Sequence, residues 1–294
     1  MTSSRVEHVI IGCGDVGRRI ARQLIKQKVK PDTILGIIRS SESASLFDEI
    51  GIKNQQIDFD SLINFSEKLV NVDCYYLVPP PKEGVLDLRS QTVLSKLTLH
   101  STELNRVVLI STTGVYGDCA GEWVTEKSVA NPQTERGKRR LHSERLWTEW
   151  CKQLGCEINI LRVPGIYANS RIPRNRINKK IPVVIADECG FTNRVHADDL
   201  ATISIVAMQS KYSGQIYNAT DGVPGKITEY LQTAALEIGA ASLPEITMQQ
   251  ARQELSQGML SYLSESRKIS NQKMLEQLDI ELRYPDFKQG LKFG

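Results

Sequence analysis

The stretch Val9-Ile10-Ile11-Gly12-Cys13-Gly14-Asp15-Val16-Gly17-Arg18 decides the fold of this chain, because it runs an apolar strand through a glycine-rich turn into a helix. Gly12 permits the tight turn, and Gly14 lets the backbone approach a phosphate group closely. Gly17 lets the helix pack against the strand, so that the positive N-terminus of the helix points at the anion. The stretch therefore predicts a site that cradles the pyrophosphate of a dinucleotide.

The residues around this motif support the same interpretation. Arg5–Ile11 has the apolar character of a buried strand, and Val16, Ile20 and Leu24 recur at helical spacing. The alternative is a glycine turn in an ordinary α/β unit. We prefer the dinucleotide interpretation because the strand, the turn and the helix stand in the order that the motif requires.

Strands and helices alternate through the first 165 residues. Strands are predicted at Arg5–Ile11, Thr33–Ile38, Asp73–Val78, Arg106–Ser111 and Glu157–Arg162, with a weaker pattern at Asn54–Asp58. Arg106–Ser111 has the Val/Ile/Leu character of a strand in a buried parallel sheet. Helices are predicted after the glycine motif and at Ser43–Ile50, Ser61–Leu69, Gly84–His100 and Thr134–Leu154. This order is typical of an α/β protein with a doubly wound parallel sheet, a Rossmann fold, which binds its ligand at the carboxyl ends of the strands.

The alternation breaks after residue 165. Ala168–Ile185 is basic and has the character of a loop. Beyond it we expect helices at His196–Met208, Thr228–Ile238 and Met248–Leu255, and a strand at Gln215–Ala219. We therefore predict a dinucleotide-binding domain over 1–165 and 191–222, and a smaller substrate lobe over 166–190 and 223–294.

The composition is that of a globular protein, with 40% hydrophobic and 24% charged residues among 294. The formal charge of +3 does not indicate a nucleic-acid surface, and the basic segment 171–180 lacks interleaved aromatic residues. No stretch reaches the ~18–20 apolar residues of a membrane span. The six cysteines are scattered without a CxxC pair. We expect a cytoplasmic monomer or homodimer with reduced thiols, no structural metal, no nucleic-acid or membrane partner, and a small-molecule substrate.

The end of the second predicted strand bears on the choice of dinucleotide. An NAD-specific site places an acidic side chain there for the ribose hydroxyls, but this chain has Arg39 and Ser40. An arginine forms a charge-assisted fork with a 2′-phosphate, which favours NADP over NAD. The alternative is a solvated arginine at a strand end. Asp58, after the third strand, is expected near the adenine, or else caps the following helix.

Beyond the glycine motif, six further segments carry a family pattern, namely Tyr75–Pro80, Ile110–Gly117, Leu161–Tyr167, Asn193–Ala201, Gly214–Asp221 and Tyr284–Leu291. Together with the glycine motif they resemble the short-chain dehydrogenase/reductase superfamily, in particular an atypical subgroup of its extended branch of nucleotide-sugar epimerases and dehydratases. The resemblance implies that Thr112 hydrogen-bonds the reacting oxygen and that the backbone from Val163 to Ile166 borders the nicotinamide. The predicted cofactor contacts are Gly12, Gly14, Asp15, Val16, Gly17, Arg39, Ser40, Asp58, Pro79, Thr112, Arg140, Val163 and Ile166. A strand-end hydroxyl that satisfies local backbone is the alternative role for Thr112.

The chain departs from this family at the catalytic helix. The family places there a tyrosine that moves the proton and, one helical turn later, a lysine that lowers its pKa. Here Arg136 stands at the position of the tyrosine and Arg140 at that of the lysine. An arginine cannot act as an acid or base near neutrality, because its pKa is above about 12. We therefore expect Arg136 to bind an anionic group of the substrate and Arg140 to bind the cofactor, whereas Lys138 and Arg139 form a solvated face. The alternative for Arg136 and Arg140 is that they belong to the same solvated face.

Other residues are candidates for proton transfer. Tyr116 and Tyr167 follow predicted strands at the ends where the substrate is expected, although both could equally be packed aromatic residues. His142 lies about 240° around the helix from Arg136 and is discounted. His196 is expected to be structural, at the entry to a helix. The catalytic candidates are therefore Thr112, Tyr116, Arg136 and Arg140.

Two functions share this pattern. The first is an NADP-dependent oxidoreductase or epimerase/dehydratase-like enzyme for a small, anionic or nucleotide-sugar-type substrate. The second is a catalytically inactive NADP(H)-binding redox sensor. The missing tyrosine and lysine favour the sensor, whereas Thr112 and the substrate lobe favour the enzyme, which is the interpretation we prefer.

Overall fold

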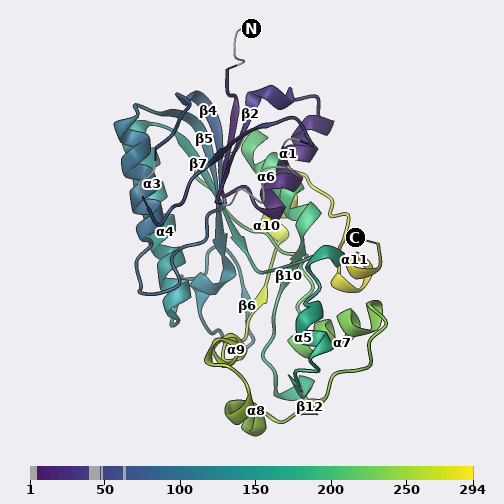
Figure 1. Cartoon of the computed structure of the whole chain (residues 1–294). Coiled ribbons are helices and arrows are strands. Elements are labelled where there is room, and N and C mark those ends of the chain that lie inside the picture. Colours follow the sequence, from purple (N-terminus) through teal and green to yellow (C-terminus); the bar gives the residue numbers. More distant parts are fainter. Residues whose placement is uncertain (1–4, 40–46, 48, 62–63, 294) are drawn as a thin grey trace. The chain divides into compact units, whose positions relative to one another are not determined.

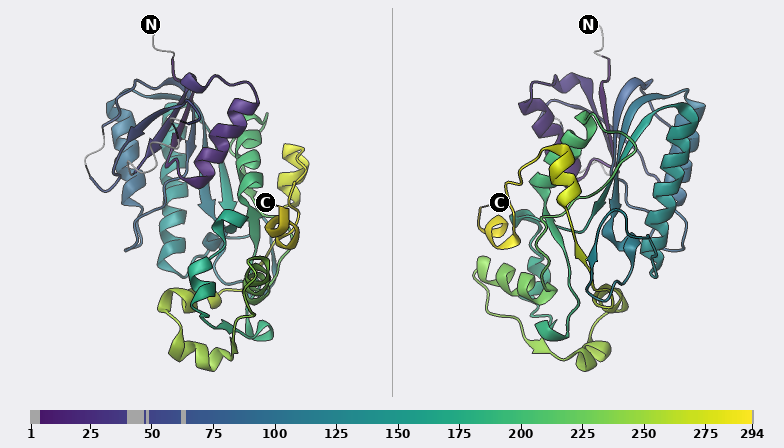
Figure 2. Two further views of the ribbon diagram at one scale, coloured as in Figure 1. Left: turned by 45° about the vertical axis from the view of Figure 1, so that its right-hand side comes forward. Right: turned by 180° about the vertical axis from the view of Figure 1, so that it is seen from behind.

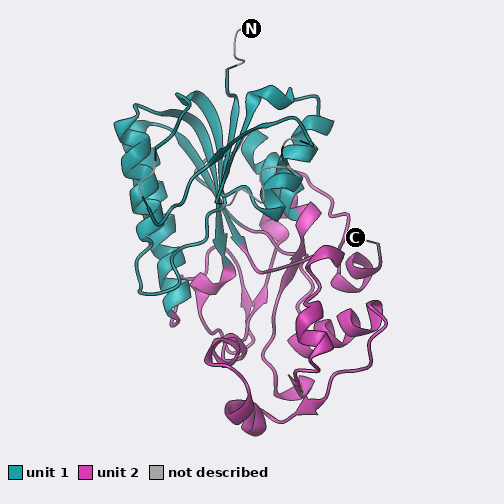
Figure 3. Cartoon of the chain, in the orientation of Figure 1, with its two compact units in different colours: residues 1–112, 135–162, 200–217 teal, residues 113–134, 163–199, 218–294 magenta. Residues whose placement is uncertain are grey.

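The computed structural model describes residues 5–39, 47, 49–61 and 64–293. These residues form two compact units, which Figure 3 colours separately. Unit 1 comprises 1–112, 135–162 and 200–217, and unit 2 comprises 113–134, 163–199 and 218–294. Each unit is therefore built from three separate stretches of the chain.

The described residues of unit 1 are organised around a seven-stranded sheet (Figure 1). Its strands are β1 (His8–Ile11), β2 (Ile34–Ile38), β3 (Lys53–Gln56), β4 (Val70–Tyr76), β5 (Glu103–Thr112), β7 (Glu157–Val163) and β11 (Ile216–Asn218). Their order is β11-β7-β5-β4-β1-β2-β3, and the pairings from β3 to β5 are parallel. The strand order reverses direction at β1, next to β4, which is where this class of sheet binds its ligand. The predicted doubly wound α/β sheet is confirmed.

Helices cover both faces of this sheet (Figures 1 and 2). They are α1 (Asp15–Lys26) and α6 (Ala197–Gln209) on one face, and α3 (Leu88–Leu99) and α4 (Glu135–Leu154) on the other. In α1 the residues at helical spacing, Val16, Ile20 and Leu24, are all buried, as predicted. Between the sheet and α4 the rings of Tyr76 and Trp147 pack with centroids 4.5 Å apart.

The predicted helices Ser61–Leu69 and Ser43–Ile50 differ in how much of each the structure describes. The described part of Ser61–Leu69 is not helical, so that prediction is wrong. The side chain of Gln55 on β3 donates to the carbonyl of Asn64 at 2.7 Å and accepts from the backbone N–H of Ser66 at 3.1 Å. This segment therefore satisfies its backbone through a neighbouring strand. The predicted helix Ser43–Ile50 falls mostly outside the described residues.

Unit 2 consists of short elements around its own cores. They are β6 (Trp123–Val124), β8 (Gly165–Tyr167), α5 (Arg174–Asn178), β9 (Val183–Val184), β10 (Arg194–His196), α7 (Ile227–Glu237), β12 (Glu245–Ile246), α8 (Met248–Glu254), α9 (Gln257–Leu263), β13 (Lys268–Ile269), α10 (Gln272–Leu278) and α11 (Phe287–Phe293). The expected loop at Ala168–Ile185 contains α5 and β9, so the segment is more ordered than predicted. Within the ranges that the structure describes, no helix is long and apolar enough to cross a membrane.

Candidate dinucleotide site

The three glycines of the motif have distinct geometric roles in unit 1. Gly12 has a φ of +87°, and a Cβ atom there would lie 2.8 Å from the backbone nitrogen of Val78. A Cβ at Gly17 would lie 3.0 Å from Cys13 Sγ and from Ile10 Cγ2, so α1 packs closely on β1. Gly14 differs, because a Cβ built there meets no atom of the described residues within 4 Å. The loop therefore needs glycine at 12 and 17 for its own fold and leaves open space at 14.

The N-terminus of α1 is arranged to receive an anion. Gly14 is the N-cap residue, and among the described residues no side chain forms a cap hydrogen bond there. The backbone N–H groups of the first turn point out of the helix, and the helix dipole favours negative charge there. Asp15 accepts a hydrogen bond from Arg19 Nε at 3.3 Å within the same helix, which balances its charge close to this end.

The glycine loop forms part of a cavity of about 350 Å³ in unit 1. Four predicted cofactor contacts line it together, namely Gly12, Gly14, Arg39 and Pro79. The remaining lining residues are Cys13, Ile38, Phe59, Asp60, Val78 and Arg89. Open space at Gly14, an uncapped helix N-terminus and an arginine at the end of β2 fit the phosphates and ribose of a dinucleotide. Ser40, the neighbour of Arg39, lies outside the described residues.

An ion pair that the sequence did not predict lies in the wall of this cavity. Arg89 donates to both carboxylate oxygens of Asp60, from Nε at 2.6 Å and from Nη2 at 2.5 Å. It also donates to the carbonyl of Pro79 at 2.9 Å. The hydrogen bonds from Arg89, and then the charge of Arg39, hold the pKa of Asp60 below its ordinary value. Asp60 is thus an anion that is already paired.

Asp58 lies in the turn before Asp60. Its Oδ1 accepts from the backbone N–H of Asp60 at 3.1 Å, so it stabilises the turn. Its expected place beside the adenine remains a prediction.

The N-terminal part of α4 binds the loop that follows β4. Arg140 Nη1 donates to the carbonyl of Val78 at 3.1 Å, and Val78 lines the cavity. Burial lowers the pKa of Arg140 from its ordinary value. Arg139 is 6% exposed and donates to the carbonyl of Gly84, so its prediction as a solvated residue is wrong. The loop returns to the helix at Gly84, and Arg139 satisfies a carbonyl there. Arg136 is half-buried, and Lys138 is exposed as predicted.

The remaining candidates of β5 and its loop fall on either side of the unit boundary. Thr112 is the last residue of β5 and is half-buried. Tyr116 belongs to unit 2, is 2% exposed, and donates from its hydroxyl to Asn218 Oδ1 at 2.8 Å. These contacts fit the packed aromatic role for Tyr116 better than the role of a proton donor.

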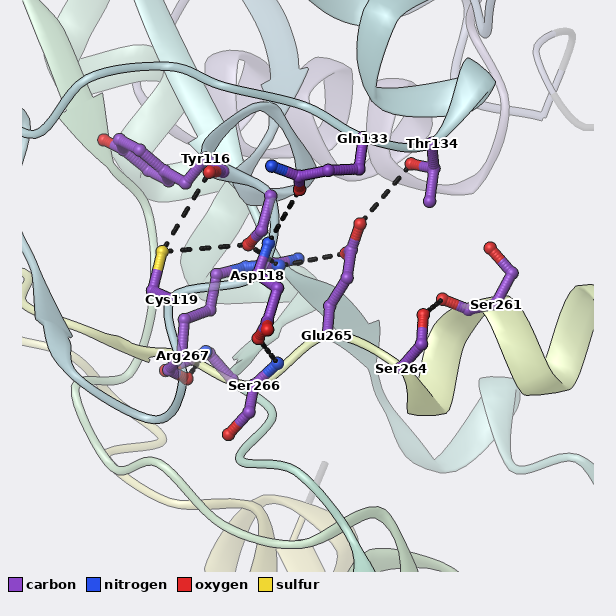
Figure 4. Close-up of polar contacts among 12 residues, drawn as sticks. Tyr116, Asp118, Cys119, Gln133, Thr134, Ser261, Ser264, Glu265, Ser266 and Arg267 are labelled. Atoms are coloured by element: carbon purple, nitrogen blue, oxygen red, sulfur yellow. Dashed lines mark hydrogen bonds and ion pairs between the residues drawn. The ribbon is translucent and has the colours of Figure 1, made fainter.

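The loop that carries Tyr116 is held by the segment before β13, as the close-up in Figure 4 shows. Asp118 Oδ1 accepts from the backbone N–H of Ser266 at 2.8 Å, and Arg267 Nη1 donates to the carbonyl of Gly117 at 2.5 Å. Arg267 is itself paired with Glu265 at 2.9 Å. Residues about 150 positions apart in the sequence therefore fix this loop, and no local sequence signal indicated it.

Tyr167 and its neighbours form an aromatic cluster within unit 2. Tyr167 is 1% exposed, and its ring lies 5.2 Å from that of His196, measured between centroids. His196 is fully buried and accepts from the backbone N–H of Asp198 at 3.2 Å, so its predicted structural role is confirmed.

Val163 ends β7 and is buried, and Ile166 lies half-buried in β8. The border that these two residues are expected to form with a nicotinamide remains a prediction.

Glycine loop, strand order and cavity together define a dinucleotide-binding α/β protein. Residues 87–220 match the model of the NAD dependent epimerase/dehydratase family. The resemblance to the extended short-chain dehydrogenases/reductases is confirmed at this level. Dependence on a nicotinamide dinucleotide is supported as a property of the family.

Solved structures share the fold over nearly the whole chain. A functionally unknown conserved protein from Silicibacter pomeroyi has a TM-score of 0.81 at 23% identity, covering 98% of this chain and 97% of that one. UDP-glucuronic acid 4-epimerase from Bacillus cereus in complex with NAD has a TM-score of 0.74 at 16% identity, covering 98% and 94%. dTDP-glucose 4,6-dehydratase from Streptomyces venezuelae with NAD has a TM-score of 0.74 at 16% identity, covering 98% and 95%. No curated protein gives a significant match.

Proposed function

We propose that this protein is an NADP-dependent oxidoreductase of the epimerase/dehydratase type that acts on a small substrate with an anionic group. The observation that carries the proposal is the cavity at the glycine loop, which combines open space at Gly14 with Arg39 at the end of β2. When bound, the dinucleotide would supply hydride transfer at its nicotinamide. The chain's own residues would bind and orient the dinucleotide and the substrate.

The preference for NADP rests on the charges in the cavity wall. Arg39 and Arg89 contribute two positive charges, and Asp60 contributes one negative charge that Arg89 already pairs. Gln56 Nε2 donates to the carbonyl of Arg39 at 3.1 Å and so fixes the backbone from which that side chain extends. A dianionic 2′-phosphate would find a guanidinium there, whereas ribose hydroxyls would find no unpaired carboxylate among the lining residues.

The substrate class follows from the catalytic helix. Two of the reported neighbours, UDP-glucuronic acid 4-epimerase and dTDP-glucose 4,6-dehydratase, are named for nucleotide sugars, which carry phosphates. Arg136 in this chain stands where the superfamily has its tyrosine, and a guanidinium binds a carboxylate or phosphate as a bidentate fork. The nucleotide-sugar class and the anion contact at Arg136 are the parts of the proposal that measurements of substrate turnover test.

The same replacement favours a second candidate function. A chain with arginine at both catalytic positions is also suited to bind NADP(H) without turnover and so to sense the redox state of the pool. The two functions make the same prediction for binding and opposite ones for NADPH oxidation.

Calorimetric titration of NADP and NAD tests the cofactor assignment. We expect tighter binding of NADP, and Arg39→Ala should weaken NADP by roughly 1.5–3 kcal/mol and leave NAD unchanged. The control is Arg22→Ala, which removes an exposed arginine of α1 outside the cavity wall and should change neither affinity. Equal affinities of the wild type for the two dinucleotides would overturn the NADP assignment. NADPH oxidation with acidic and neutral carbonyl compounds and nucleotide sugars then separates enzyme from sensor.

A further inference from the structure

Two cysteines meet at the C-terminal end of α4, independently of the proposed function. The helix ends at Leu154, Gly155 has a φ of +72°, and the backbone N–H of Cys156 donates to the carbonyl of Cys151 at 3.0 Å. This is the 6→1 hydrogen bond of a Schellman motif, which brings the first and last of the six residues together. In such motifs these two side chains usually make an apolar contact, and here both of them are thiols.

The surroundings of the two sulfurs differ in a way that matters for reactivity. Cys151 is fully buried, whereas Cys156 is half-buried and packs at the edge of the same hydrophobic core. Both thiols are free. A hydrogen bond from the Cys151 thiol lowers the pKa of Cys156, and the same contact raises that of Cys151. Cys156 is therefore the member of the pair that solvent reaches and that ionises first.

We propose that Cys151 and Cys156 form a thiol–disulfide modification site, in which a low-molecular-weight disulfide oxidises the pair to an intramolecular disulfide. The turn meets the main geometric demand, because a disulfide needs Cα atoms about 4.4–6.8 Å apart and the Schellman bond holds the two residues close. The site closes a loop of only six residues, so the surrounding helix and strand need little rearrangement.

The chemistry balances with oxidised glutathione as the oxidant. The Cys156 thiolate attacks one sulfur of glutathione disulfide, whose S–S bond breaks, and one glutathione thiolate leaves. The Cys151 thiol then gives its proton to solvent and attacks the Cys156 sulfur, and the second glutathione leaves. The protein loses two electrons and two protons, and one glutathione disulfide becomes two glutathione thiols.

Peptide mapping reads the bond directly, because Lys152 lies between the two cysteines. After treatment of the native protein with oxidised glutathione and alkylation of free thiols, trypsin should release residues 146–152 and 153–162 as one disulfide-linked species, two hydrogens lighter than the separate peptides. A thiol reductant should convert it back. Cys119 serves as an internal comparison, since its half-buried sulfur lies against the carbonyls of Tyr116 and Gly117 and should give only a glutathione adduct.

Single variants test the order of events. Cys151→Ala should stop at a glutathione adduct on Cys156, and Cys156→Ala should leave Cys151 unmodified because it is buried. Cys74→Ala should keep the linked species, which excludes the buried Cys74 as the true partner. Since a core variant can fail to fold, the decisive result is that of the wild type. A wild-type protein that remains folded and yields no linked peptide, or one in which either cysteine is linked to Cys74, overturns the proposal.

Discussion

Arg162 on β7 binds Glu144 on α4 through two hydrogen bonds, from Nε to Oε1 at 3.1 Å and from Nη2 to Oε2 at 2.8 Å, and both side chains are only 5% exposed. Ser111 on β5 adds a third bond, from its hydroxyl to Glu144 Oε1 at 2.5 Å. One carboxylate thus joins the helix to two neighbouring strands. It lies one helical turn beyond Arg140, so the pair fixes the part of α4 that contacts the cavity loop.

Breaking this pair from one side should destabilise the protein strongly. Arg162→Met leaves a buried carboxylate without its cation, which costs about 3–5 kcal/mol in comparable sites. The double variant Arg162→Met with Glu144→Leu removes both charges and should recover much of that loss. Urea unfolding of the single and double variants measures both effects. Additive losses in the double variant would show that the two charges do not act as a pair.

The two glycines at the start of α1 should respond differently to the same change. Gly17→Ala places a methyl group 3.0 Å from Cys13 Sγ and Ile10 Cγ2, so we expect a loss of about 1–3 kcal/mol in the free energy of unfolding. Gly14→Val faces open space, so the fold should persist, but its side chain occupies the room that a pyrophosphate needs. Thermal unfolding and dinucleotide titration separate the two outcomes. Retained binding in a folded Gly14→Val protein would contradict the assignment of the loop.

Apolar patterning predicted most strands of the sheet because β1, β2, β4, β5 and β7 are largely buried, whereas β3 is polar and only partly buried. The glycine loop was predictable because Gly12 and Gly17 meet local steric demands of the fold, whereas Gly14 leaves open space for a ligand. The same logic failed at Ser61–Leu69, where a single side chain, Gln55, takes over backbone groups that a helix would have paired.

The walls of the site were harder to predict because they depend on contacts between distant residues. Asp60 and Arg89 are 29 positions apart, and neither stands in a motif. Arg139 has the pattern of a surface residue on α4, and its burial depends on where the loop through Gly84 returns. A charged residue's partner is set by tertiary structure, so a helical pattern cannot distinguish a solvated arginine from one that holds a loop.

The stability of unit 2 should depend on pH through Asp221. This carboxyl is 7% exposed, and burial raises its pKa to about 7, although the backbone N–H of Val223 donates to Oδ1 at 3.0 Å. Because its folded-state pKa lies above the ordinary value of about 3.9, the folded state binds the proton more tightly than the unfolded state. The tighter binding of this proton stabilises the folded state by an amount on the order of 4 kcal/mol. This stabilisation is fully present below pH ~4 and is lost as the pH rises to 7.

Asp221→Asn keeps the acceptor for Val223 and removes the titration. Relative to this variant, the wild type should therefore lose stability between about pH 4 and pH 7. Denaturant unfolding of both proteins across this range measures the difference. A constant difference between wild type and variant would show that Asp221 does not titrate there.

The last prediction concerns Arg136, whose proposed role is to bind an anionic group of the substrate and not to transfer a proton. Arg136→Lys replaces a bidentate fork with a point charge, so KM for an anionic substrate should rise about 10-fold while kcat changes less. Lys138→Ala, on the same turn but exposed, is the matched control and should leave both constants unchanged.

The variant Arg136→Tyr with Arg140→Lys restores the superfamily's pair but removes the anion contact. It should lose the native activity and give any slow reduction of neutral carbonyl compounds a pH dependence that the wild type lacks. Steady-state NADPH oxidation measures each case. If the wild type turns over neutral sugars and Arg136→Ala leaves that rate unchanged, the anion contact is wrong, and if NADP(H) binds without any turnover, the sensor becomes the better interpretation.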